Sequence, residues 1–154
     1  MAGKEETGET LVTTNRRARH EYSILDTYET GIVLTGTEVK SLRQGTANLA
    51  DGYAMIRDGE LWLFGMHISP YAHGSYSNVD PLRRRKLLVH KKELRKLAAR
   101  VQDKGLTLIP LKVYFAHGIA KLQLGVCRGK REYDKRQDIA KREAERAIRR
   151  HIPR

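Results

Sequence analysis

The sequence predicts a mostly-β domain in which about six strands close into a small barrel, with flanking helices and a basic C-terminal tail. Runs of β-branched and aromatic residues recur along the chain, and Asp58-Gly59 and His117-Gly118 are turn signals that join neighbouring runs into hairpins. A closed barrel leaves a small domain with no exposed sheet edges, which favours this arrangement. A small α+β sandwich is the alternative that periodicity leaves open.

Three regions follow from the distribution of polar and apolar residues. Residues 1–14 are polar and contain three glutamates with no apolar run, so we expect a flexible leader and not a secretory signal. Residues 15–130 are long enough to bury a hydrophobic core and form the body. Residues 131–154 form the tail, which we expect to be disordered alone and helical when bound.

The first half of the body is predicted to form a strand, a short helix and a hairpin. A basic run over 15–22 enters a strand that continues toward Leu34, with a bend or bulge expected at Gly31. A short helical turn follows, with Thr37 as the expected N-cap and Gly45 as the stop. Residues 50–65 form the clearest hairpin, around Asp58-Gly59.

The second half of the body is predicted to form a loop, a helix and a second hairpin. Residues 71–81 contain Gly, Asn, Asp and Pro and predict a surface loop, after which 87–89 resume a strand. The apolar spacing over 91–103 predicts an amphipathic helix ended by Gly105. Strands over 106–116 and 119–128 then flank His117-Gly118. Together these elements favour a barrel of the oligonucleotide-binding type.

Half of the net charge of +12 lies in less than a fifth of the chain. The last 27 residues carry 11 lysines and arginines against 5 acidic residues, and they contain few large apolar side chains. Acid-to-base pairs at i, i+4, such as Glu132–Arg136 and Asp138–Arg142, nevertheless favour a helix. Such a segment is expected to fold on a polyanionic partner, and a disordered solubilising tail is the competing interpretation.

Basic clusters in the body point to the same partner class. They comprise Arg16, Arg17 and Arg19, then Arg83, Arg84, Arg85 and Lys86, then Arg128, Lys130 and Arg131. One such run is usually a solvated face, but three of them favour a surface that follows phosphates. Tyr71, His73 and Tyr76 either stack on unpaired bases or pack on the barrel rim, and the sequence does not separate these two roles.

Catalytic and metal-binding patterns are absent from the sequence. It contains no Gly-rich phosphate loop, no His-Glu-x-x-His pair and no nucleophile elbow, and its six histidines lack metal-ligand spacing. His20 and Glu21 are adjacent, and adjacent residues of a strand point to opposite faces. We therefore expect no enzyme, no cofactor and no metal.

Other classes are excluded on similar grounds. No apolar run approaches the length of a membrane-spanning helix, and a single cysteine, Cys127, suits a reducing compartment. We expect a cytoplasmic, monomeric RNA-binding protein with no membrane partner. An integral ribosomal protein or general single-strand binder is the main rival function.

Several long motifs resemble the SmpB family, the bacterial proteins that bind SsrA, or transfer-messenger RNA. They are NRRARHEY (15–22), TGTEVKSLR (35–43), DPLRRRKLL (80–88), AKLQLGVCRGK (120–130) and YDKR (133–136). The resemblance implies an oligonucleotide-binding barrel that grips the tRNA-like domain of this RNA and takes it to ribosomes stalled on messages without a stop codon. It also implies that the tail enters the decoding centre and the empty mRNA channel. Partners would be the RNA, the ribosome with its 16S rRNA and both subunits, and indirectly elongation factor Tu.

Site residues follow partly from the resemblance and partly from the basic clusters. For RNA binding, the resemblance implies Asn15, Arg16, Arg17, Arg19, His20, Glu29, Leu88 and Lys121, and the clusters add Arg83, Lys86, Arg128 and Lys130. For the ribosome, the expected residues are Gly129, Arg131, Tyr133, Asp134, Lys135, Arg136, Lys141, Arg142 and Arg146. Arg131 replaces a lysine common in the family, and the aromatic Tyr133 precedes Asp134. Short polar groups such as Glu29 suit base edges or 2′-hydroxyls, whereas arginines set the register on phosphates.

Overall fold

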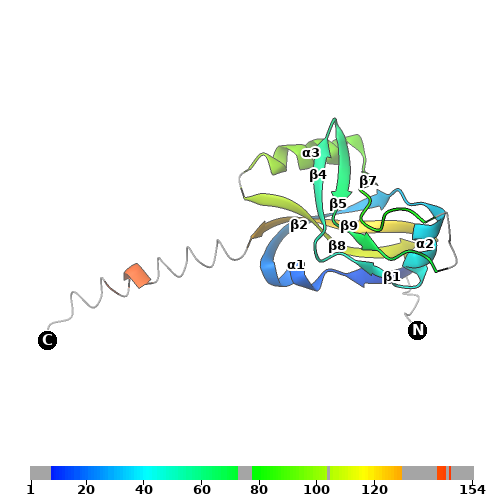
Figure 1. Cartoon of the computed structure of the whole chain (residues 1–154). Helices are drawn as coiled ribbons and strands as arrows, with labels where there is room; N and C mark the ends of the chain where they lie inside the picture. The colour runs from blue at the N-terminus through cyan, green and yellow to red at the C-terminus, as the bar shows by residue number, and fades with distance from the viewer. Residues whose placement is uncertain (1–7, 73–77, 104, 130–141, 145, 147–154) are drawn as a thin grey trace.

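The chain winds most of its strands into one curved sheet, with the helices placed around it (Figure 1). The structure is a computed structural model and describes residues 8–72, 78–103, 105–129, 142–144 and 146. Its elements in chain order are β1 (Glu9–Thr14), α1 (Arg16–Glu21), β2 (Tyr22–Ile32), α2 (Gly36–Arg43), β3 (Ala47–Asn48), β4 (Tyr53–Arg57), β5 (Glu60–Phe64), β6 (His67–Ile68), β7 (Arg85–Leu88), α3 (Lys91–Val101), β8 (Leu106–Ala116) and β9 (Ile119–Gly129).

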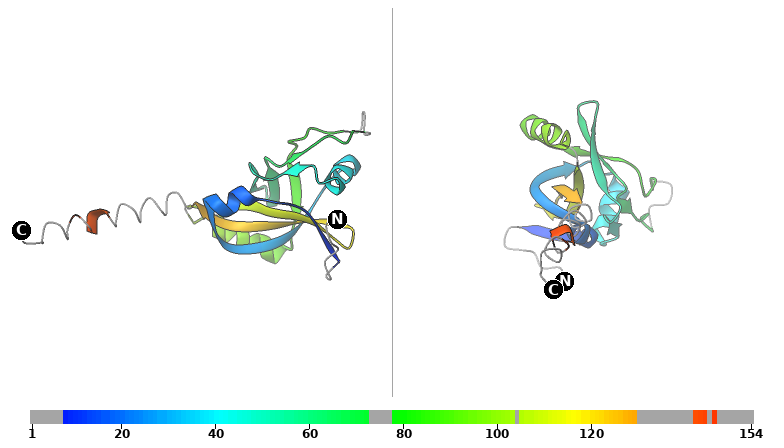
Figure 2. Two further views of the ribbon diagram at one scale, coloured as in Figure 1. Left: turned by 90° about the horizontal axis from the view of Figure 1, so that it is seen from below. Right: turned by 90° about the vertical axis from the view of Figure 1, so that its left-hand side faces the viewer.

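Six of these strands form a closed ring, which confirms the predicted barrel. Their order is β4-β5-β7-β2-β9-β8, and β8 closes the ring by pairing back to β4 at Leu108 and Ala54. The pairings of β9 with β2 and with β8 are the longest in this ring. The view along the structure in Figure 2 (right) shows β2 and β9 curving, with α3 and α2 on different sides. All neighbouring pairs are antiparallel, as in barrels of the oligonucleotide-binding type.

Both predicted hairpins are confirmed. Asp58 and Gly59 have φ values of 52° and 73°, and His117 and Gly118 have φ values of 51° and 80°. Positive φ at both central residues is the backbone of a type I′ turn, whose twist matches that of the flanking strands. These turns fix which residues face one another in β4–β5 and in β8–β9.

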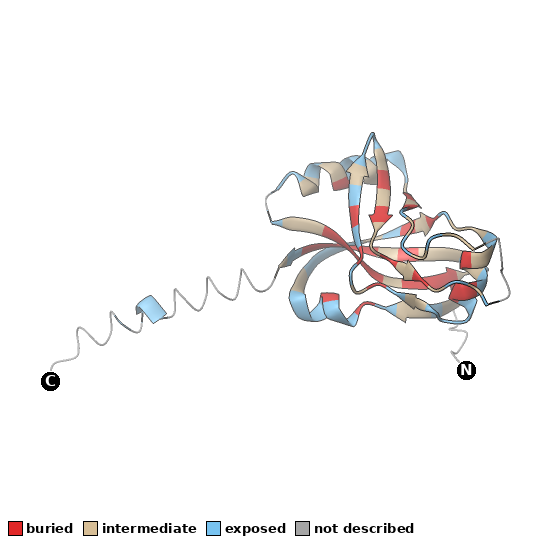
Figure 3. Ribbon diagram, viewed as in Figure 1, coloured by how far each residue is buried: buried red, intermediate tan, exposed pale blue. Residues whose placement is uncertain are grey.

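The core lies inside the ring (Figure 3). Alternate residues of β9 point inward, so Leu122, Leu124 and Val126 are fully buried. Helix α3 covers part of this core with Leu97, in agreement with the helix predicted from its apolar spacing. Full burial of one leucine side chain contributes about 1.5–3 kcal/mol.

The first strand corrects the prediction of a flexible leader over 1–14. Residues 9–14 form β1, which pairs antiparallel with the second half of β8, Glu9 opposite Ala116 and Thr14 opposite Lys112. Because β4 pairs with β8 only at Leu108, the rest of that edge of β8 accepts another strand. Residues 1–7 lie outside the described part of the chain.

The basic run over 15–22 does not lead directly into the predicted strand, because residues 16–21 form α1. The helix begins at Asn15, whose side chain caps the first turn by accepting a hydrogen bond from the Ala18 amide. Ala18 faces inward and packs with Ile109, Leu111 and Cys127 on the outer face of β8 and β9. Burial raises the pKa of the Cys127 thiol to about 11, so it remains protonated near neutral pH.

Two further local predictions are wrong. The irregularity in β2 lies between Ile24 and Asp26, and Gly31 stays in regular register opposite Lys121 and Leu88. A Cβ atom at Gly31 would lie 3.2 Å from the Leu88 Cβ, so close strand approach explains this glycine. The cap of α2 is Thr35, not Thr37, because Thr35 and Glu38 form a capping box.

Candidate nucleic-acid interface

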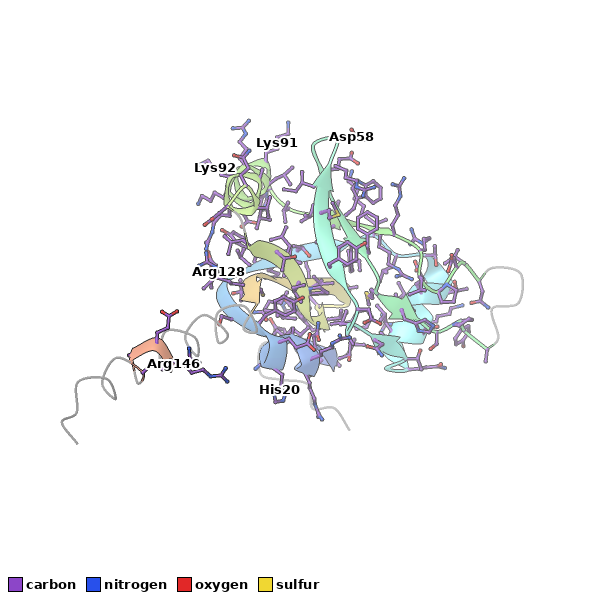
Figure 4. The ribbon with its side chains drawn as sticks, turned by 60° about the vertical axis from the view of Figure 1, so that its left-hand side comes forward. His20, Asp58, Lys91, Lys92, Arg128 and Arg146 are labelled. Carbon is purple, nitrogen blue, oxygen red and sulfur yellow. The ribbon has the colours of Figure 1, made fainter. Side chains whose placement is uncertain are left out.

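Helix α1 presents a cluster of basic side chains to solvent. Arg16, Arg17, Arg19 and His20 are all exposed, and Figure 4 shows His20 pointing away from the body. Arg17 pairs with Glu21 at 3.1 Å and with Asp51 at 2.9 Å. The hydrogen bond and charge of Glu21, aided by Asp51, raise the pKa of Arg17. The helix thus supplies the first of the predicted basic clusters on one rigid element.

Asn15 differs from the expectation that its side chain contacts RNA. It is only 2% exposed, and its amide donates hydrogen bonds to the Leu49 carbonyl at 3.1 Å and to the Pro110 carbonyl at 2.8 Å. Its side-chain oxygen caps α1 at Ala18. Asn15 therefore holds the basic helix against the barrel, and the residues that follow it reach solvent.

We predict that Asn15→Ala loosens α1 and lowers the free energy of unfolding by about 2–4 kcal/mol, because the cap is lost and the Leu49 and Pro110 carbonyls each lose one donor. Chemical denaturation measures this change. Asn15→Asp keeps a capping oxygen but replaces the donor nitrogen with a carboxylate oxygen that faces two carbonyls, so its cost should also be substantial. A loss below about 1 kcal/mol in Asn15→Ala would contradict the structural role of this residue.

The end of β9 lies beside α1. Tyr22, directly after the helix, pairs with Gly129, and Ser23 pairs with Arg128. Arg128 is exposed and points outward in Figure 4, with Asp103 at 3.7 Å from its guanidinium. The strand register thus brings Arg128 of the third basic cluster to the same end of the barrel as the first cluster, although most of the chain separates them in sequence.

A second group of predicted residues converges at the other end of β2. Glu29, Leu88 and Lys121 line one pocket of about 530 Å³, between the end of β2, the start of α3 and the β8–β9 turn. Leu88 is 51% exposed, which is unusual for a leucine beside a barrel core. The exposed Glu29 carboxylate can accept a hydrogen bond from a ligand, and the apolar surface of Leu88 can pack against a base or sugar. The Lys121 ammonium group can bind a phosphate.

Helix α1 and the Glu29 group lie on the same outer face of the sheet, whereas Arg128 alternates to the other face at the end of β9. Residues 121, 123, 125 and 127 of β9 share one face, and α1 covers that face at Cys127. Glu29 is opposite Gln123, so it belongs to this face too. The distance along β2 from Tyr22 to Glu29 is about 23 Å, at about 3.3 Å per residue. A ligand that touches both groups therefore spans most of the barrel wall.

The second basic cluster, residues 83–86, does not form the free phosphate-binding surface that its charge predicted. Arg85 is fully buried, and its guanidinium donates hydrogen bonds to Glu38 at 2.6 Å and to the Met66 and Pro81 carbonyls. Arg83 also donates to Glu38, at 2.5 Å. Burial tends to raise the pKa of Glu38, but the hydrogen bonds from Arg83 and Thr35 and the charge of Arg85 lower it overall. This network ties α2 to β7.

The other two members of that cluster also have partners within the protein. Arg84 lies over the Trp62 ring at 4.7 Å, and Lys86 pairs with Glu60 at 3.1 Å. The prediction that Arg83 and Lys86 bind RNA therefore gains no support from their surroundings. The burial of Arg85 could not be predicted from the sequence, because a run of four basic residues has the same pattern whether its side chains face solvent or form buried ion pairs.

The remaining predicted positions lie mostly outside the described residues. Lys40 lies over the Tyr71 ring at 5.6 Å, whereas His73 and Tyr76 are not described. In the tail, Arg142 and Arg146 are helical and exposed. The predictions that lie outside the described ranges concern Lys130, Arg131, Tyr133, Asp134, Lys135, Arg136 and Lys141.

Tyr114 lies next to the Glu29 group of residues, although no sequence motif marks it. It is opposite Lys121 in the β8–β9 hairpin, on the face that carries Glu29, and is 6% exposed. The predicted turn at His117-Gly118 contained the needed signal, because counting back from a two-residue turn pairs Tyr114 with Lys121.

Neither a metal centre nor a membrane segment is found in the part of the chain that the structure describes. Within it, no three or more His, Cys, Asp or Glu side chains gather closely enough to hold a metal ion. Across the same ranges, no helix has the length and apolar composition needed to cross a membrane.

Comparison with known proteins gives consistent matches over nearly the whole chain. The family described as SmpB protein matches residues 12–154. The SsrA-binding protein of Desulfitobacterium hafniense is 55% identical over 142 residues, covering 92% of this chain and 91% of the relative. That of Lactiplantibacillus plantarum is 57% identical over 140 residues, covering 91% and 90%.

A solved structure matches as well. It is described as "tmRNA-SmpB: a journey to the center of the bacterial ribosome", and its matching chain is 59% identical with a TM-score of 0.66. The match covers 77% of this chain and 83% of the solved one.

Proposed function

Because the chain belongs to the SmpB family, we propose that it binds the tRNA-like domain of transfer-messenger RNA and delivers this RNA to stalled ribosomes in trans-translation. Its relatives are named SsrA-binding proteins, and the matching solved structure concerns tmRNA, SmpB and the bacterial ribosome. The protein acts as a binding partner in the cytoplasm, as a monomer, and meets elongation factor Tu only through the RNA.

The observation that carries the proposal is the convergence of Glu29, Leu88 and Lys121 in one pocket, on the face that α1 occupies at its other end. These residues come from β2, β7 and β9 and are far apart in the sequence. A generic basic binder needs only positive charge, whereas this pocket combines a carboxylate and an exposed leucine with a lysine. Such a combination suits recognition of an RNA shape more than attraction to phosphate alone.

We propose that the two ends of this face divide the work of RNA binding. Arg16, Arg17, Arg19 and Arg128 supply phosphate contacts at the α1 end, and the Glu29 pocket supplies selectivity. The tail, whose charge is concentrated beyond Gly129, enters the decoding centre and the empty mRNA channel.

The test is binding of the purified protein to a transcript of the tRNA-like domain, to an ordinary tRNA and to an unrelated hairpin over a salt series. We expect a preference for the first RNA that survives at high salt, because base and sugar contacts add to the salt-sensitive phosphate contribution. Lys121→Ala should weaken that binding, and each lost phosphate contact should lower the salt slope by about 0.7–0.9.

Lys96→Ala is the matched control, because Lys96 is exposed on α3 and outside the pocket. Equal binding to all three RNAs, fading together as the salt concentration rises, would indicate a general RNA binder and refute the proposal.

A further inference from the structure

We propose that Tyr114 is a positioning residue for RNA recognition, which orients the Glu29 carboxylate by donating a hydrogen bond to it across strand β9. This inference rests on the proposed function, since it concerns how Glu29 meets the tRNA-like domain. Glu29 is exposed at the rim of the pocket, and Tyr114 is almost completely covered. The pair therefore consists of a solvent-exposed carboxylate that can contact RNA and a buried tyrosine that can hold it in place.

The register of three adjacent strands places the two side chains on one face. Glu29 on β2 is opposite Gln123 on β9, which is opposite Lys112 on β8. Two residues further along, Gly31 is opposite Lys121, which is opposite Tyr114. Glu29 and Tyr114 are thus two strands apart, about 10 Å across the sheet, and two residues apart along it, about 7 Å, a span that only long side chains bridge. A hydrogen bond from the Tyr114 hydroxyl to the Glu29 carboxylate would bridge this span, and the influence of Glu29 on the pKa of Tyr114 agrees with such a contact.

The Tyr114 ring is held in place by its surroundings. Tyr114 is 6% exposed, pairs with Leu11 of β1 on its other side, and has the Lys112 ammonium 5.1 Å from its ring centre. Burial, followed by the charge and hydrogen bond of Glu29, raises the pKa of Tyr114, so its hydroxyl remains a donor at any physiological pH. A buried ring with few rotamers can fix a glutamate that would otherwise sample several.

The chemistry of Glu29 explains why its orientation matters. An ionised carboxylate only accepts hydrogen bonds, so on RNA it can read 2′-hydroxyls and the amino or imino groups of bases. It also repels phosphates, so a freely rotating carboxylate would oppose binding as often as it helped. One bond from Tyr114 occupies one acceptor site and leaves the others for RNA. Fixing the carboxylate before RNA arrives removes an ordering cost from binding.

The experiment is a double-mutant cycle with Tyr114→Phe, Glu29→Ala and the combined variant, measured as binding to the tRNA-like-domain transcript at fixed salt. Tyr114→Phe removes only the hydroxyl. We expect it to weaken binding about three- to tenfold, the cost of ordering one long side chain. We also expect the combined variant to bind no more weakly than Glu29→Ala alone, because the hydroxyl acts only through Glu29. Affinity for an unrelated hairpin should not change.

Tyr28→Phe is the matched control, because Tyr28 precedes Glu29 on β2 but packs against the core on the opposite face. It should leave RNA affinity unchanged. The positioning role would be overturned if Tyr114→Phe left RNA affinity unchanged. It would also be overturned if the affinity losses of the two single variants added in the combined variant. The proposed function fails separately: in that case the wild-type protein shows no preference for the tRNA-like domain and Glu29→Ala changes nothing, which overturns this inference as well.

Discussion

Replacing Arg85 by alanine is expected to lower the free energy of unfolding by about 3–5 kcal/mol, the cost of removing one partner from a buried ion pair. Arg85 is fully buried, and Glu38, its partner, is 3% exposed. Without Arg85, the Glu38 carboxylate remains buried with Arg83 and the Thr35 amide as its hydrogen-bond donors. The Met66 carbonyl also loses the Arg85 donor, and the Pro81 carbonyl keeps only the Ile68 amide. Thermal and urea denaturation of the full chain measures the loss.

The neighbouring Arg84→Ala is the matched control for this change. Arg84 is exposed and lies over Trp62, so its removal should cost less than about 1 kcal/mol. Arg85→Lys keeps the charge but lacks the planar fork that reaches Glu38 and two carbonyls at once, and it should not restore full stability. Equal losses in Arg84→Ala and Arg85→Ala would show that the run acts as a charged surface and not as a core network.

The combined Lys135→Ala and Arg136→Ala variant is expected to abolish peptide tagging on stalled ribosomes while changing affinity for the tRNA-like domain less than about threefold. Both residues lie in the tail, outside the described part of the chain, and the predicted contacts with the tRNA-like domain lie in the body. Because the residues expected to contact the tRNA-like domain belong to the body, removal of these two tail charges should leave its affinity largely intact. The measurements are RNA binding and tagging of a peptide encoded by a message without a stop codon.

Arg95→Ala with Lys96→Ala is the matched control, because it removes one arginine and one lysine from an exposed face of α3. This pair should leave both tagging and RNA affinity near their wild-type levels. A collapse of RNA affinity in the tail variant would mean that body and tail do not divide the two tasks.

Local signals in the sequence predicted much of the fold. The hairpin at Asp58-Gly59 and the helix α3 were predicted correctly, because turn conformation and apolar spacing depend on residues a few positions apart. The predictions for α1 and β1 failed because distant residues decide their structure. Asn15 anchors α1 through the Leu49 and Pro110 carbonyls, and β1 uses the part of the β8 edge that β4 leaves.

The candidate site divides in the same way. The sequence supplied Glu29, Leu88 and Lys121 only through motif resemblance, and the strand register brought them to one pocket. Tyr114 carries no motif, so its link to Glu29 emerged only when β8, β9 and β2 were placed side by side. The basic run around Arg85 predicted an exposed charge, whereas the fold buries this side chain against Glu38.

By itself, the sequence determined the class of this protein: a basic, strand-rich body with local turn and helix signals, and a C-terminal end whose last 27 residues carry half of the net charge. These properties depend on composition and on neighbours along the chain. Only the tertiary structure decided which charges face solvent and which are paired inside. Burial and strand register join residues that are remote in sequence, such as Glu38 with Arg85 and Glu29 with Tyr114, and a linear pattern contains no measure of that distance.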